Sequence, residues 1–133
     1  MTFRKEEKII ISDTEISSLK NLIEKKGFKI LHPKRKIESI YFENIDLRCF
    51  YESEEGILPR KKFRIRNYPE QKIKKYNLEI KTSSIEGRFK QSNQITNNLN
   101  QSYLKNGIFN NLYGLLRKKV KISYLRQYYG LND

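Results

Sequence analysis

The chain has 133 residues and a formal net charge of +13, from 28 Lys and Arg against 15 Asp and Glu. Its nine Tyr and seven Phe exclude a disordered chain, and its length allows one domain, residues 1–133, with a hydrophobic core. No apolar run approaches the ~20 residues that span a bilayer, and the N-terminus lacks the apolar segment of a signal peptide. One cysteine excludes an internal disulfide. We therefore expect a cytoplasmic globular protein with an anionic partner.

Residues 3 to 11 are predicted to form the first strand. Alternate side chains of a strand point to opposite faces, so Arg4, Glu6 and Lys8 share one charged face.

A helix is predicted next. Ser12 to Glu15 has the pattern of a capping box, apolar residues then keep helical spacing, and Gly27 supplies a stop. Because this helix is amphipathic, we expect it to cover a sheet. The basic cluster Lys34 to Lys36 is interpreted as a solvated loop, and residues 37 to 43 alternate as a second strand.

A short helical turn is predicted from Asp46 to Glu55, closed by Gly56. Cys49 lies inside it and is interpreted as buried filler rather than a nucleophile. His32 is isolated, and one histidine makes neither a metal site nor a catalytic triad.

Two central strands, around residues 60 to 68 and 76 to 81, have a charged face and an apolar face. On the charged faces lie Lys62, Arg64, Arg66 and Tyr68 of the first strand, and Asn77, Glu79 and Lys81 of the second. Arg88 and Lys90 share a face of the next short strand. Together these strands predict a cationic surface suited to phosphate, although a charged strand face is usually just solvated.

The C-terminal third has a weaker pattern. Residues 91 to 111 are rich in Asn and Gln and predict a loop, with one short helix near Phe109 to Leu116. Alternation returns from Val120 to Tyr128 and places Tyr124 and Arg126 on one face. The elements together predict an α+β domain with a mostly antiparallel β-sheet and flanking helices.

Several of these motifs, in this order, resemble the VTC domain. This is the polyphosphate-polymerase branch of the triphosphate tunnel metalloenzymes, within the CYTH-like superfamily. The motifs are Arg4-x-Glu6-x-Lys8, Ser39-Ile40-Tyr41-Phe42-Glu43, Arg60 to Tyr68, Leu78-Glu79-Ile80-Lys81 and Ser123-Tyr124-Leu125-Arg126.

The resemblance implies a β-barrel tunnel that binds ATP, another triphosphate or polyphosphate with Mn²⁺ or Mg²⁺. In such domains the terminal phosphate of a nucleotide is transferred to a growing polyphosphate chain. By motif position, the implied phosphate ligands are Lys8, Arg64, Arg66, Lys81, Lys90 and Arg126. Glu6 and Glu79 are the implied metal ligands, although either carboxylate can instead hold neighbouring cations in place. No catalytic residue is assigned.

In the family, further strands follow the Tyr-x-Arg strand, among them a second Glu-x-Lys, and this chain ends before them. We therefore expect a partial barrel, incomplete at its C-terminus and less suited to catalysis alone than to anion binding. A fragment of a longer product, a half that pairs with a second chain or with itself, and a degenerate remnant all stay open.

The alternative function is a nucleic-acid-binding module, most simply for RNA. Tyr and Phe interleaved among basic residues suit single strands, because bases stack on aromatic rings in a cationic groove. No specific RNA-binding motif accompanies them. A membrane-surface or scaffold protein is the third possibility, and no residue pattern favours it.

Overall fold

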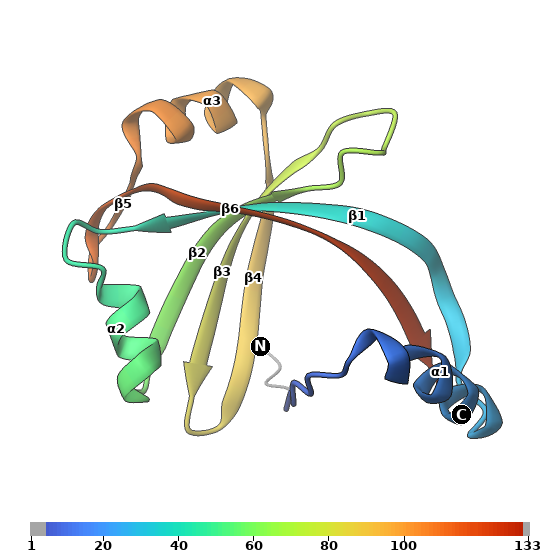
Figure 1. Ribbon diagram of the computed structural model, residues 1–133. Coiled ribbons are helices and arrows are strands. Elements are labelled where there is room, and N and C mark those ends of the chain that lie inside the picture. The colour runs from blue at the N-terminus through green and yellow to red at the C-terminus, as the bar shows by residue number, and fades with distance from the viewer. Residues whose placement is uncertain (1–4, 132–133) are drawn as a thin grey trace.

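The computed structural model describes residues 5–131 and confirms the α+β class (Figure 1). Its elements in chain order are η1 (Asp13–Glu15), α1 (Ile16–Lys25), β1 (Lys29–Glu43), α2 (Arg48–Glu55), β2 (Arg60–Asn67), β3 (Tyr76–Ser84), β4 (Gly87–Ile95), α3 (Asn97–Asn106), β5 (Ile108–Asn110) and β6 (Gly114–Gly130).

One antiparallel sheet holds the domain together, with the strand order β4-β3-β2-β1-β6-β5. The sheet is curled into an arch: β1 and β6 cross the direction of β2, β3 and β4 and curve away together toward α1 (Figure 1). Helix α3 lies on the outer side of the arch, while the segment before η1 runs beneath it. The curvature gives the sheet a convex and a concave face.

The hydrophobic core lies on the convex face, which α3 and β5 cover. Phe63 and Ile65 of β2 are 1% and 2% exposed and pack with Phe42 and Leu116. Tyr103 and Leu104 of α3 pack against this cluster. The predicted alternation of β2 is therefore confirmed, since its apolar residues enter the core and the arginines between them point to the opposite face.

Helix α2 forms where the predicted helical turn lies, and Gly56 ends it with φ 70°. Cys49 is buried in the core cluster, as predicted. Desolvation by burial, with the nearby Glu43 carboxylate, raises the pKa of the Cys49 thiol to about 12. The thiol therefore stays protonated at neutral pH and is not an activated nucleophile.

The predicted first strand is wrong for the described residues, because residues 5–12 contain no strand. This segment pairs with no neighbouring strand, and Ile9 and Ile10 are 80% and 99% exposed. Alternation alone cannot form a strand without a partner for its backbone groups. Residues 3 and 4, with the predicted Arg4 position, lie outside the described residues.

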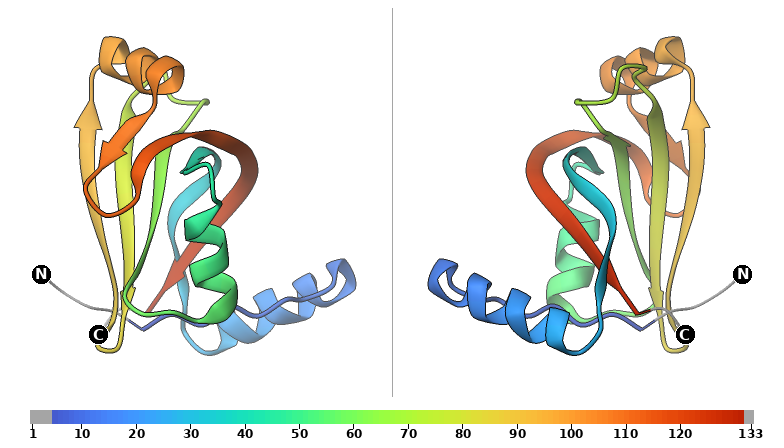
Figure 2. Two further views of the ribbon diagram at one scale, coloured as in Figure 1. Left: turned by 90° about the vertical axis from the view of Figure 1, so that its left-hand side faces the viewer. Right: turned by 90° about the vertical axis from the view of Figure 1, so that its right-hand side faces the viewer.

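Helix α1 forms as predicted, but it does not cover a sheet. It has no buried residue and projects from the far end of the β1 and β6 arm (Figure 2). The capping box is also absent, since the Ser12 Oγ donates to Glu15 Oε1 at 2.8 Å instead of accepting from a backbone amide. Amphipathic spacing predicted the helix correctly and its location wrongly.

Two further expectations are corrected along the chain. Strand β1 begins at Lys29, so Lys34 to Lys36 belong to a strand rather than to a loop. The helix predicted near Phe109 to Leu116 is absent, and that stretch holds β5, a turn and the start of β6. The helix is instead α3, whose N-cap Thr96 accepts from Leu99 N at 3.1 Å. Asn and Gln interrupt the apolar spacing of α3, so the sequence pattern did not indicate a helix there.

Candidate anion-binding surface

The concave face of the sheet gathers charged side chains from five strands. The register places Arg64 opposite Tyr41 on β1 and opposite Glu79 on β3, and Lys81 opposite Lys90 on β4. On the other side, β1 pairs with β6, which brings Tyr124 and Arg126 to the same face. Five strands thus bring residues that are far apart in sequence to one basic surface.

Glu79 is the centre of the first group on this face, which we call the Glu79 cluster: Glu79, Arg64, Arg66 and Lys90. Its Oε1 lies 2.7 Å from Arg64 Nη2 and 3.8 Å from Arg66 Nε, and its Oε2 lies 3.5 Å from Lys90 Nζ. Arg64 and Arg66 are 6% and 4% exposed, and Glu79 is 4% exposed. The two arginines predicted as phosphate ligands are therefore also buried partners of a carboxylate.

The charges in the Glu79 cluster reinforce one another. Burial acts to raise the pKa of Glu79, but the charge and hydrogen bond of Arg64, helped by Lys90 and Arg66, outweigh it and hold that pKa below its usual value. For Arg64, desolvation acts to lower the pKa, and the hydrogen bond and charge of Tyr41 together with those of Glu79 raise it. Glu79 and Arg64 are thus both charged at neutral pH.

Tyrosine hydroxyls link this cluster to its neighbours. Arg64 Nη1 donates to Tyr41 OH at 3.1 Å, and Arg66 Nη2 donates to Tyr124 OH at 2.8 Å. The same Tyr124 oxygen accepts from Arg126 Nη2 at 2.9 Å, so one phenol joins two arginines. Arg126, predicted as a phosphate ligand, therefore lies beside Arg66.

Arg35 is the basic residue that the sequence analysis missed. It lies on β1 directly opposite Arg126 on β6. Its guanidinium carbon is 4.0 Å from the centroid of the Tyr68 ring, and its Nη2 donates to Tyr128 OH at 3.0 Å. The sequence did contain a signal. Arg35 is separated by two-residue steps from Ile37, Ser39 and Tyr41, so all four side chains point to the same face of the strand.

The remaining predicted residues lie at the hairpin end of β3 and β4. Glu6, Lys8 and Lys81 line a hollow of about 220 Å³ together with Lys62 and Arg88. Glu6 Oε1 is 3.9 Å from Arg88 Nη1. The predicted phosphate ligands therefore divide between two parts of the concave side: Lys8 and Lys81 line this hollow at the hairpin end, and Arg64, Arg66, Lys90 and Arg126 lie around and beyond Glu79.

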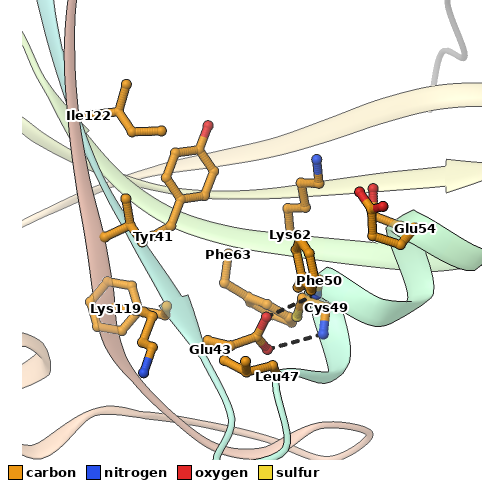
Figure 3. A pocket seen from close by; sticks show the side chains of 13 residues that line it. Tyr41, Glu43, Leu47, Cys49, Phe50, Glu54, Lys62, Phe63, Lys119 and Ile122 are labelled. Atoms are coloured by element: carbon orange, nitrogen blue, oxygen red, sulfur yellow. Dashed lines mark hydrogen bonds between the residues drawn. The ribbon is translucent and has the colours of Figure 1, made fainter.

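An apolar hollow of about 600 Å³ adjoins the concave face beside α2 (Figure 3). Phe50, Tyr41 and Ile122 contribute to its walls, and Lys62 lies at its edge. Glu43 Oε1 accepts from Cys49 N at 3.0 Å and its Oε2 from Phe50 N at 2.9 Å, which fixes the start of α2 against β1. Since Tyr41 also contacts Arg64 and Lys62 also lines the basic hollow, this apolar hollow borders the cationic surface.

The carboxylates do not form a ready metal site. Among residues 5–131, no group of three or more His, Cys, Asp and Glu is close enough to hold a metal ion. The Glu79 oxygens are shared with three cations, which matches the alternative interpretation that this carboxylate holds its basic neighbours in place. The described side chains alone therefore do not supply the set of oxygen donors that Mg²⁺ or Mn²⁺ requires. The metal role of Glu6 and Glu79 stays a prediction.

The chain was compared with known protein families and with curated proteins. The family model described as the VTC domain matches residues 3–130, nearly the whole chain. No curated protein matches the chain. Within the described part of the chain, no helix is long and apolar enough to cross a membrane.

Proposed function

The chain belongs to the VTC domain family, and from this membership and the concave face we propose that it binds the phosphate chain of a nucleoside triphosphate or of polyphosphate. One observation carries the proposal. Arg64, Arg66, Lys90 and Arg126 converge from three strands, β2, β4 and β6, on one surface around the Glu79 carboxylate of β3.

The surface suits phosphate for chemical reasons. Arginine presents a planar fork of N–H donors that matches phosphate oxygens, whereas lysine acts as a point charge. Arg126 donates hydrogen bonds to the Tyr124 and Tyr128 oxygens, and the other N–H donors of its guanidinium remain for a ligand. Arg66 is held by Ser39 Oγ at 3.0 Å and by Tyr124, which fixes its position before a ligand arrives.

We further propose that the bound chain takes part in phosphoryl transfer of the polyphosphate-polymerase type. A terminal oxygen of polyphosphate attacks the terminal phosphorus of the nucleotide, and the bond from that phosphorus to the bridging oxygen of the nucleoside diphosphate breaks. The reaction requires positioning and charge neutralisation more than a covalent nucleophile. The role of this chain's arginines is to hold the phosphates and neutralise the charge on their oxygens.

Mn²⁺ or Mg²⁺ remains part of the proposal as a partner of the phosphate oxygens. Both are hard ions that bind through substrate phosphates and one or two carboxylates. Because the Glu79 oxygens are shared with cations, we propose that the ion enters with the ligand. No step above depends on it.

The test is a calorimetric titration of tripolyphosphate, with and without Mn²⁺, into the wild type and the Arg126→Ala variant. Arg117→Ala is the matched control, since it removes the same charge from an exposed part of β6. We expect Arg126→Ala to weaken binding about tenfold, the size of one charge-assisted hydrogen bond, and Arg117→Ala to change it little.

A short single-stranded RNA serves as the competing ligand. Binding of RNA in preference to tripolyphosphate, with a steep loss of affinity as salt rises, would contradict the proposal and support the nucleic-acid-binding alternative. Absence of tripolyphosphate binding would contradict it as well.

A further inference from the structure

We propose that Arg35, next to Arg126, forms a second anion subsite, which holds the part of a linear polyphosphate that extends beyond the three phosphates bound near Arg64, Arg66 and Arg126. The inference rests on the proposed function. It assigns a ligand role to Arg35 and a preference for chains longer than a triphosphate.

The two arginines face each other across neighbouring strands. Arg35 on β1 is the register partner of Arg126 on β6, and both side chains lie near Tyr128. Like charges directly opposite in an antiparallel pair are destabilising. Among the described residues, neither arginine forms an ion pair with a carboxylate. An anion between them would relieve this repulsion.

Aromatic rings hold the Arg35 guanidinium in place. Its central carbon lies 4.0 Å from the Tyr68 ring centroid and 5.1 Å from that of Tyr128. Cation–π contacts of this kind fix a guanidinium without neutralising its charge. Arg35 is therefore positioned before a ligand arrives and keeps its full positive charge.

The donor inventory of Arg35 points in the same direction. A guanidinium has five N–H donors, and within the described chain Arg35 uses one, on Tyr128 OH. Its Nε is buried and has no hydrogen-bond partner, a cost that an arginine serving only the fold would avoid. By contrast, Arg64 makes contacts to Glu79 and Tyr41 with all three nitrogens.

The new subsite continues the surface already described. Arg126 and Arg66 donate to the same Tyr124 oxygen, and Arg126 faces Arg35. A chain of phosphates lying along β6 therefore meets Arg66, then Arg126, then Arg35. The order predicts that Arg35 contacts a longer polyphosphate but not a triphosphate.

The test compares tripolyphosphate with a long-chain linear polyphosphate, titrated into the wild type, Arg35→Ala, Arg35→Lys and the control Arg117→Ala. We expect Arg35→Ala to weaken long-chain binding about tenfold and tripolyphosphate binding less than about twofold. Arg35→Lys keeps the charge without the fork and should give an intermediate loss for the long chain. Thermal melts of each variant establish that it is folded.

Every other outcome refutes either the second subsite or the proposed function. An equal loss for both ligands would place Arg35 in the triphosphate site, and an unchanged long-chain affinity would remove Arg35 from the surface. Both results refute the second subsite and leave the proposed function standing. If Arg35→Ala does not fold, an unchanged preference for long chains in Arg35→Lys refutes it. Failure of the wild type to bind either phosphate ligand would refute the proposed function itself.

Discussion

The Glu79 cluster and the Arg35–Arg126 pair are two arginine groups on one concave face, and they differ in what surrounds them. In the first, Arg64 and Arg66 are almost fully buried and share a carboxylate. In the second, the arginines are half-buried, and their described contacts are to tyrosine rings and hydroxyls. Position on the same surface therefore does not give the same role.

The different surroundings of the two arginine groups indicate which group mainly stabilises the fold and which mainly binds the ligand. A buried arginine paired with a carboxylate contributes to stability, because removing either partner leaves an uncompensated charge. An arginine held by aromatic rings keeps its charge available to an incoming anion. We infer that the Glu79 cluster fixes the sheet in addition to lining the phosphate site, whereas the arginines beyond it act mainly on the ligand.

Removing the carboxylate should have the largest effect on stability. Glu79→Gln leaves Arg64, Arg66 and Lys90 without their shared partner, and we expect it to lower the free energy of unfolding by about 3 kcal/mol. Urea unfolding followed by circular dichroism measures this. Glu70→Gln, in the exposed loop between β2 and β3, is the control and should change stability little. Equal stability of the two variants would contradict a structural role for the cluster.

The same carboxylate predicts a dependence on acid pH. The pKa of Glu79 in the folded chain lies below its usual 4.5, so its contribution to stability is complete above that value and is lost as the pH falls through the folded pKa. The stability difference between wild type and Glu79→Gln should therefore narrow in acid. Unfolding curves collected from neutral to acid pH measure this difference in unfolding free energy. A difference that does not change with pH would show that the neighbouring cations do not hold Glu79 ionised.

Arg126→Ala should separate binding from stability. Because Arg126 pairs with phenols and is half-buried, we expect its loss to cost less than about 1 kcal/mol of unfolding free energy, alongside the tenfold weaker phosphate binding predicted above. Urea unfolding of the variant beside Glu79→Gln gives the comparison. A loss as large as that of Glu79→Gln would remove the distinction between the two groups.

The smallest expected effect is a shift in the titration of Tyr128. Burial acts to raise the pKa of this phenol, but the hydrogen bonds and charges of Arg35 and Arg126 lower it below its usual value. Arg35→Ala should therefore raise the pKa of Tyr128. Carbon-13 labelled tyrosine followed by NMR through alkaline pH resolves this one phenol, and an unchanged pKa would show that Arg35 does not contact it in solution.

The strands of the concave face were predictable because their two faces differ sharply. Phe63 and Ile65 alternate with Arg64 and Arg66, so period two reveals both the strand and its orientation. The link from Arg66 to Arg126 depends on the pairing of β1 with β6, which no local pattern encodes. Family resemblance supplied Arg126, since alternation alone gives no reason to place it beside β2.

The missed features have physical causes. Arg35 lies in a run of three basic residues, and a run of charge obscures the alternation that its strand follows. Helix α1 has a strong apolar stripe, yet spacing within a helix carries no information on what the stripe meets. The strand expected before it failed because strands require a partner, and pairing is decided by the whole fold.

A map of the binding site in solution tests the central claim most directly. Tripolyphosphate titrated into the nitrogen-15 labelled chain, followed by amide chemical shifts, locates every backbone group that senses the ligand. We predict shifts concentrated on the concave strands, around Arg64, Arg66 and residues 124–126, and little change in α3 on the convex side. Shifts confined to exposed basic positions such as Lys118 and Lys119, or spread evenly over the surface, would show that the concave face is not the anion site.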